Sequence, residues 1–168
     1  MTPYTVSEVE PRIYLKETAN HPYHTSLSSP EEVLAFMQEY LADLTTECIL
    51  VFNLDNHNNV INFSRVGIGT ANSVFTTGRE IFKTAILSNA CSIILCHNHL
   101  SNDPSPSKSD VKFTRYMYMC SMLLGIPLID HIIVTPEKNY YSFVTSLPSL
   151  FTLNDDTSAI AAEGGPNG

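Results

Sequence analysis

The apolar positions of this chain follow two periods, and these divide most of its length into helices and strands. Apolar residues three or four positions apart mark an amphipathic helix, whereas a short apolar run between turn residues marks a buried strand. This pattern predicts helices over residues 30–44, 77–89 and 107–124. It predicts strands over residues 47–54, 60–68, 92–97, 128–135 and 140–144.

Polar residues with capping chemistry set the helix boundaries. Ser29 is followed three positions later by Glu32, which is the spacing of a capping box. Thr77 stands in the same relation to Glu80. Gly125 is expected to end the third helix, because glycine readily adopts the left-handed conformation that closes a helix.

Each predicted helix has an apolar stripe that we expect to pack against the strands. The stripe of the first helix comprises Val33, Leu34, Met37, Tyr40, Leu41 and Leu44. That of the second comprises Ile81, Phe82, Ala85 and Ile86. That of the third comprises Val111, Thr114, Met117, Ser121 and Leu124. The order of helix, hairpin, helix, strand, helix and strands indicates a mixed α/β fold with helices against one sheet.

The length of 168 residues is that of one main domain, which we assign to residues 29–153. Residues 1–28 are expected to form an N-terminal extension that contains an edge strand. Residues 154–168 are polar, acidic and rich in glycine, so we expect a disordered tail.

Composition and charge restrict the classes of function. The formal net charge is −8 and the pI about 5.1, so the chain as a whole lacks the basic surface that sequence-independent nucleic-acid binding requires. The four cysteines form no Cys-x-x-Cys pair and no secretory signal opens the chain, so we expect reduced thiols in a cytoplasmic protein. No apolar run approaches the roughly 18 residues needed to cross a membrane.

The segment CHNHLSNDPSPSKSD, residues 96–110, contains the most distinctive chemistry. His97 and His99 are two positions apart at the end of a predicted strand, so their side chains face the same way. Asp110 lies in the first turn of the following helix. Two imidazoles and one carboxylate that converge in this way predict a metal site with an open position, which is the pattern of catalytic zinc.

Two further residues have both a catalytic and a structural interpretation. Glu47 begins an otherwise apolar strand, either as a solvated residue at the strand end or as the acid/base of a hydrolase. In the latter role it would take a proton from a metal-activated water and pass it to the leaving amine. Ser107 is either the helix cap or a hydroxyl donor to that water or to a developing oxyanion.

Three polar or sulfur-containing residues near the histidines are not expected to be ligands. Cys96 would face away from the pair, into the core. Asn98 would also face away and hold the loop in place. His131 lies in the apolar stretch IDHII and is interpreted as a buried histidine that makes a hydrogen bond.

Together these residues resemble the JAMM motif of JAB/MPN metallo-isopeptidases. The segments REIFKTAILSNACSIILCHNHLSNDPSPSKSD and LIDHIIVTPEKNYYSF are similar to the RadC-like branch of that family, and the similarity extends over roughly residues 46–143. The resemblance implies a JAB/MPN, cytidine-deaminase-like, three-layer α/β fold with helices packed on a mixed β-sheet. It also implies Zn²⁺ on His97, His99 and Asp110, an acid/base role for Glu47, and assistance to the water or transition state from Ser107.

The resemblance implies a zinc-dependent hydrolase that cleaves a peptide or isopeptide bond in a peptide or protein substrate. Leu100 and Asn102 depart from the family pattern, which usually has Pro and Gly there, and this difference affects the substrate groove. The alternative is a RadC-like protein of DNA repair or mobile elements, acting as a metal-dependent nuclease or as a non-catalytic binding module. The net charge disfavours nucleic acid, and the intact ligand set argues against a non-catalytic role.

Overall fold

The computed structural model describes Tyr14, Lys16 and residues 29–41, 45–68 and 76–152. The predicted N-terminal edge strand and the predicted disordered tail lie outside these residues, as does the predicted continuation of the first helix over 42–44. The description below is restricted to the ranges given.

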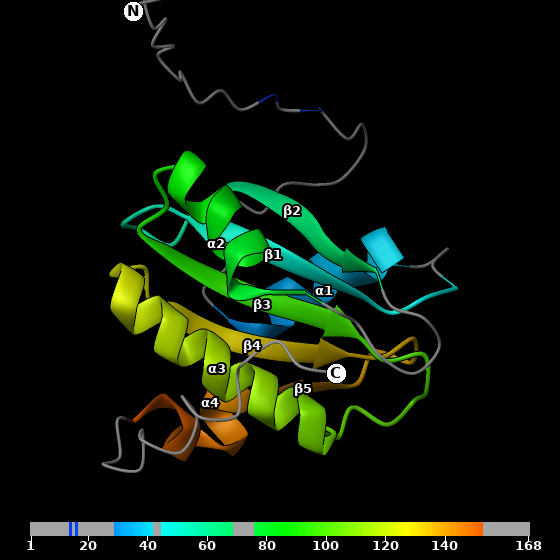
Figure 1. Ribbon diagram of the computed structural model, residues 1–168. Coiled ribbons are helices and arrows are strands. Elements are labelled where there is room, and N and C mark those ends of the chain that lie inside the picture. Colours follow the sequence, from blue (N-terminus) through cyan, green and yellow to red (C-terminus); the bar gives the residue numbers. More distant parts are fainter. Residues whose placement is uncertain (1–13, 15, 17–28, 42–44, 69–75, 153–168) are drawn as a thin grey trace, which may run out of the picture.

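The centre of the molecule is a five-stranded mixed sheet with the strand order β2-β1-β3-β4-β5 (Figure 1). The strands are β1 (Cys48–Leu54), β2 (Val60–Ile68), β3 (Ser92–Asn98), β4 (Leu128–Val134) and β5 (Tyr140–Ser142). β3 and β4 run parallel, and the other neighbouring pairs are antiparallel. All seven residues of β1 and of β3 are buried, because helices cover both faces of the sheet there.

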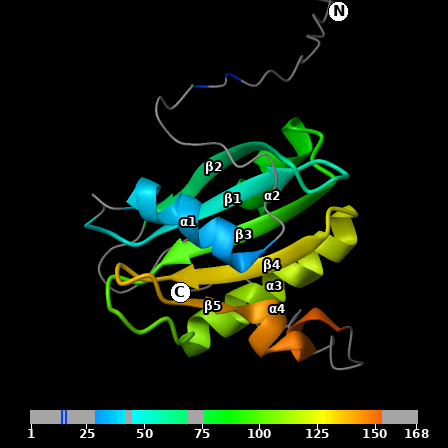
Figure 2. The same cartoon turned by 180° about the vertical axis from the view of Figure 1, so that it is seen from behind.

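The helices form the two outer layers, as the predicted three-layer α/β fold requires. They are α1 (Pro30–Leu41), α2 (Gly78–Leu87), α3 (Lys108–Leu124), the short α4 (Phe143–Ser146) and the 3-10 helix η1 (Pro148–Phe151). α2 and α3 lie on one face of the sheet, and α1 lies on the other, in front of the strands in Figure 2.

The alternation of side chains along the strands builds a separate apolar core on each face of the sheet. Val33 and Met37 of α1 pack with Leu50 and Cys96 on one side. Cys96 therefore faces the core away from the histidines, as predicted. The α2 and α3 side contains Ile81, Phe82, Ala85 and Met117 with Val51, Ile93 and Leu95. Odd-numbered residues of β3, His97 among them, face this second core.

Among the stripe residues whose side chains the structure describes, two are exposed. Ile86 of α2 has 54% of its surface exposed, because it lies one position beyond Ala85 and is rotated off the buried stripe. Leu124 of α3 is 48% exposed and lies in the last turn, next to Gly125, where the chain leaves the helix.

The predicted strand 140–144 is shorter in the structure. β5 ends at Ser142, whose side chain accepts a hydrogen bond from the backbone N–H of Thr145 and caps α4. This serine therefore turns the chain into a helical element that the apolar pattern does not reveal.

Candidate metal centre

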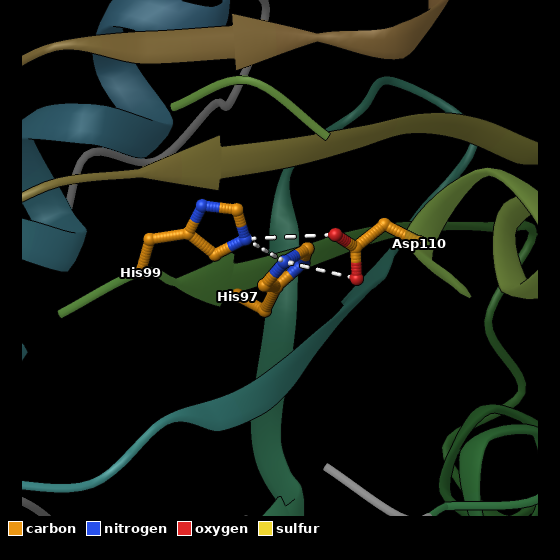
Figure 3. A group of neighbouring side chains, drawn as sticks. All are labelled: His97, His99 and Asp110. Carbon is orange, nitrogen blue, oxygen red and sulfur yellow. Dashed lines mark hydrogen bonds and ion pairs between the residues drawn. The ribbon is translucent and has the colours of Figure 1, made fainter. Parts of the chain in front are cut away.

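The end of β3 and the start of α3 bring three potential metal ligands together (Figure 3). His97 is in β3, His99 follows it directly after Asn98, and Asp110 is in the first turn of α3. The Nε2 atoms of the two imidazoles are 3.1 Å apart. Nε2 of His97 lies 3.6 Å from Oδ1 of Asp110, and Nε2 of His99 lies 3.6 Å from Oδ2.

These separations fit a tetrahedral metal ion. Zinc–ligand bonds of about 2.0–2.2 Å at tetrahedral angles place neighbouring ligand atoms about 3.3–3.6 Å apart. The two nitrogens are 3.1 Å apart, and each lies 3.6 Å from a different oxygen of Asp110, so these separations are close to that range. With one ligand atom from each residue, the three atoms lie within 4.8 Å of one another. Two nitrogens and a carboxylate oxygen could therefore bind one ion and leave a fourth position open.

The second nitrogen of each imidazole has a hydrogen-bond partner that orients the ring. Nδ1 of His99 lies 3.0 Å from the backbone carbonyl oxygen of Asp103, which can only accept a hydrogen bond. Nδ1 of His97 lies 2.8 Å from Nε2 of His131, on β4. Such outer partners are typical of metal-binding histidines, because they fix the ring and direct the other nitrogen to the ion.

Ser107 is the N-cap of α3 and is bonded to Asp110 in a complete capping box. Its backbone N–H donates to Oδ2 of Asp110 over 2.8 Å, and its hydroxyl donates to the same oxygen over 2.6 Å. Its Oγ also accepts from the backbone N–H of Asp110, at 3.2 Å. The cap predicted from the sequence is confirmed, and it fixes the carboxylate toward the histidines.

The surroundings of the three groups lower the pKa values of His97 and Asp110 and raise that of His99. Burial lowers the pKa of His97 to about 4. Burial acts to raise the pKa of Asp110, but hydrogen bonds from His99 and Ser107 and the nearby His97 outweigh it and hold that pKa below its usual value. The pKa of His99 is raised, chiefly by its interaction with Asp110. An ionised carboxylate and a neutral His97 are the forms that a metal ion needs.

Glu47 lies next to this cluster but outside the three-residue group. β1 pairs with β3 so that Ile49 is opposite His97, and the same register places position 47 opposite His99. The carboxylate of Glu47 makes a small contribution to the raised pKa of His99, after the larger effect of Asp110. Glu47 is partly buried and directly precedes β1, an interior strand of the sheet.

Asn98 holds the segment that contains Glu47. Its Oδ1 accepts a hydrogen bond from the backbone N–H of Cys48 over 2.8 Å, and its Nδ2 donates to the backbone carbonyl of Thr46 over 3.3 Å. The side chain therefore bonds the backbone of the residues immediately before and after Glu47. The sequence predicts that Asn98 faces away from the histidines. In that orientation its side chain makes both of these hydrogen bonds.

The structure adds residues that the spacing of the motif does not identify. His131 is completely buried behind His97, and burial lowers its pKa well below the usual value. The hydroxyl of Thr114 on α3 lies 2.6 Å from Nδ1 of His131. The interpretation of His131 as a buried histidine that makes a hydrogen bond is confirmed. For Thr114, the available signal is a polar residue on the apolar stripe of α3.

Leu100 and Asn102 differ from the family pattern, yet His97, His99 and Asp110 still lie together. Leu100 is 41% exposed, and the backbone carbonyl of Asn102 accepts a hydrogen bond from Asn139. The non-glycine residues with positive φ among the described ranges are Asn58, Asn89 and Lys138, so Asn102 does not adopt a left-handed conformation.

Comparison with known proteins gives the same family as the motif. A family model described as "RadC-like JAB domain" matches residues 27–147. A "UPF0758 protein" of Clostridium acetobutylicum is 43% identical over 108 residues, which are 64% of this chain and 47% of the relative. A second, of Caldanaerobacter subterraneus, is 38% identical over 125 residues, which are 70% of this chain and 54% of the relative. The chain thus spans about half the length of the curated relatives it matches.

In the described part of the chain, the helices are too short or too polar to cross a membrane.

Proposed function

This chain belongs to the RadC-like JAB domain family, and on that premise we propose that it is a zinc-dependent hydrolase of the JAMM type, which cleaves a peptide or isopeptide bond. The observation that carries the proposal is the arrangement of His97, His99 and Asp110, whose potential ligand atoms lie within 4.8 Å of one another and which form a group of three among the described residues. Three ligands with an open position are the pattern of a catalytic zinc site, whereas structural sites have four.

A zinc ion held by these residues would supply a Lewis acid that lowers the pKa of water to about 7. The residues of the chain would provide the remaining functions. Glu47, on the same face of the sheet and opposite His99, would accept a proton and return it to the leaving amine. Ser107 donates its hydroxyl hydrogen to Oδ2 of Asp110 in this structure, and in the reaction it would turn that hydrogen toward the charge that develops on the substrate oxygen.

The proposed substrate is a peptide or protein, and the proposed compartment is the cytoplasm. The net charge of −8 supports this choice over a polyanion such as DNA, because nucleic-acid binding draws most of its affinity from cationic side chains. The four cysteines, Cys48 and Cys96 buried among them, are free thiols, as the cytoplasm maintains them.

The test compares Glu47→Gln with the unmodified protein on a panel of peptide and isopeptide substrates. We expect Glu47→Gln to keep its zinc and to lose hydrolysis by a factor of about 10²–10⁴, because the acid/base group is removed while the ligands stay in place. Glu137→Gln is the matched control, since this glutamate is exposed in the turn between β4 and β5.

Full hydrolysis by Glu47→Gln would remove Glu47 from the mechanism. DNA is included in the same panel. If the zinc-loaded protein cuts DNA but no peptide, and His97→Ala abolishes the cutting, the nuclease alternative replaces the peptidase.

A further inference from the structure

We propose that His131 and Thr114 are positioning residues, which hold His97 in the one tautomer whose Nε2 can bind a metal ion. The inference rests on the proposed metal site, but it concerns groups that do not contact the ion. It follows from counting the hydrogens along a chain of three hydrogen bonds, of which the two that involve His131 are buried.

The chain of hydrogen bonds begins at the backbone of a proposed ligand. The hydroxyl of Thr114 donates to the backbone carbonyl oxygen of Asp110 over 2.7 Å. A carbonyl oxygen can only accept, and a hydroxyl has one hydrogen, so this bond uses the only hydrogen of Thr114. The contact of 2.6 Å between Oγ1 of Thr114 and Nδ1 of His131 must therefore use a hydrogen on the imidazole.

The same count continues to His97. A neutral imidazole has one N–H, and in the completely buried His131 it is at Nδ1, so Nε2 of His131 is an acceptor. The contact of 2.8 Å with Nδ1 of His97 must then use a hydrogen on His97. Nε2 of His97 is left with its lone pair, directed toward His99 and Asp110. One tautomer of His131 and one of His97 satisfy all three hydrogen bonds of this chain.

Aromatic packing keeps His131 in the required orientation. The ring of Phe143 is stacked on it, with centroids 4.9 Å apart and an interplanar angle of 7°. Phe113 of α3 contacts it edge-on, with centroids 5.8 Å apart. A ring fixed in this way keeps its Nδ1 toward Thr114 and its Nε2 toward His97, which is the orientation that the hydrogen count requires.

The chain of hydrogen bonds also links two ligands that come from different elements. It starts at the backbone of Asp110, on α3, and ends at the side chain of His97, on β3. Thr114, one turn after Asp110, and His131, on the neighbouring strand β4, therefore fix the distance between helix and strand as well as the tautomer.

The first experiment is ¹⁵N NMR of the full chain without metal, which reports the protonated nitrogen of each imidazole. We expect the hydrogen of His97 at Nδ1 and that of His131 at Nδ1. A hydrogen at Nε2 of His97 would overturn the proposal. Since no zinc is added, this result stands whether or not the protein is a hydrolase.

The second experiment measures zinc affinity by competition with a chelator. We expect Thr114→Val and His131→Phe to weaken zinc binding by about 10- to 100-fold, as loss of an outer partner typically does. Thr114→Ser keeps the hydroxyl, and His131→Gln keeps an acceptor for His97, so both should stay within a few-fold of the unmodified protein.

Thermal unfolding of the metal-free variants separates positioning from stability. A purely structural role would lower the melting temperature of Thr114→Val but leave its zinc affinity and the His97 tautomer unchanged, and that result would overturn the proposal. An unmodified chain that binds no zinc, yet has His97 protonated at Nδ1, would defeat the proposed hydrolase function and leave the tautomer assignment intact.

Discussion

At the scale of single residues, the site depends on side chains that hold other side chains. Ser107 fixes the carboxylate of Asp110, and Asp103 orients the ring of His99 through its backbone carbonyl. Asn98, between the two histidines, holds the backbone on either side of Glu47. A displacement of about 1 Å can cost a factor of about 10² in rate, so under the proposed function these contacts should affect hydrolysis as well as stability.

Asn98→Ala is expected to separate metal binding from hydrolysis. Without the amide, the backbone around Glu47 loses both hydrogen bonds, and we expect hydrolysis to fall about 10- to 100-fold with zinc content unchanged. The lost partner of the buried Cys48 N–H should also lower the free energy of unfolding by about 1–3 kcal/mol. Asn53→Ala is the control. Asn53 is also buried, but it lies at the other end of β1, where its side chain donates a hydrogen bond to Asn62 of β2. If both variants lose hydrolysis alike, the effect is general destabilisation.

Two substitutions separate the capping role of Ser107 from the proposed catalytic role of its hydroxyl. Ser107→Ala should lower the free energy of unfolding by about 1 kcal/mol, whereas Ser107→Asn should restore it, because asparagine is an equally good N-cap. The proposed catalytic role predicts that both variants lose hydrolysis, by a factor of about 10² or more. Normal hydrolysis by Ser107→Asn would show that the residue acts as a cap alone. Urea denaturation and initial rates give the two readouts.

At the scale of elements, the site lies where a strand ends and a helix begins, and the boundaries of both are well determined. The capping box fixes the start of α3, and Gly125 ends it with φ of 66°. α3 connects two parallel strands, β3 and β4, and so carries the chain from the histidines to His131. The helix therefore contributes a potential ligand at its start and packs against the sheet with its buried stripe.

Gly125→Ala tests the C-terminal boundary of α3. Nothing lies within 4 Å of an added Cβ, so the expected loss of about 1–2 kcal/mol in the free energy of unfolding comes from the left-handed backbone alone. Gly125→Asn should lose less, since asparagine tolerates this conformation. Zinc content should not change, because the residue is at the opposite end of α3 from Asp110. An unchanged stability of Gly125→Ala would contradict the cap assignment, and denaturant titration measures it.

At the scale of the whole molecule, the sequence predicts the ligand group better than its surroundings. His97, His99 and Asp110 could be grouped because strand alternation and a capping box are local features of the chain. The contact of His97 with His131 could not, since it depends on β4 lying parallel to β3 with Leu95 opposite His131. The location of Glu47 beside His99 depends in the same way on the antiparallel register of β1 and β3. Pairing of distant strands is not encoded in any one segment.

The layered fold explains how these distant segments form one site. Both faces of β1 and β3 are covered, so the strand ends are held by two apolar cores rather than by the loop that joins His99 to α3. The ligands are therefore attached to rigid elements, which is the condition for a preorganised metal centre.

The most direct test of the central claim is a crystal structure of the zinc-loaded protein with anomalous diffraction measured at the zinc edge. The account predicts one anomalous peak per chain, in contact with Nε2 of His97, Nε2 of His99 and the carboxylate of Asp110, and with no fourth side chain. A peak at another place, or a fourth protein ligand that closes the site, would contradict it.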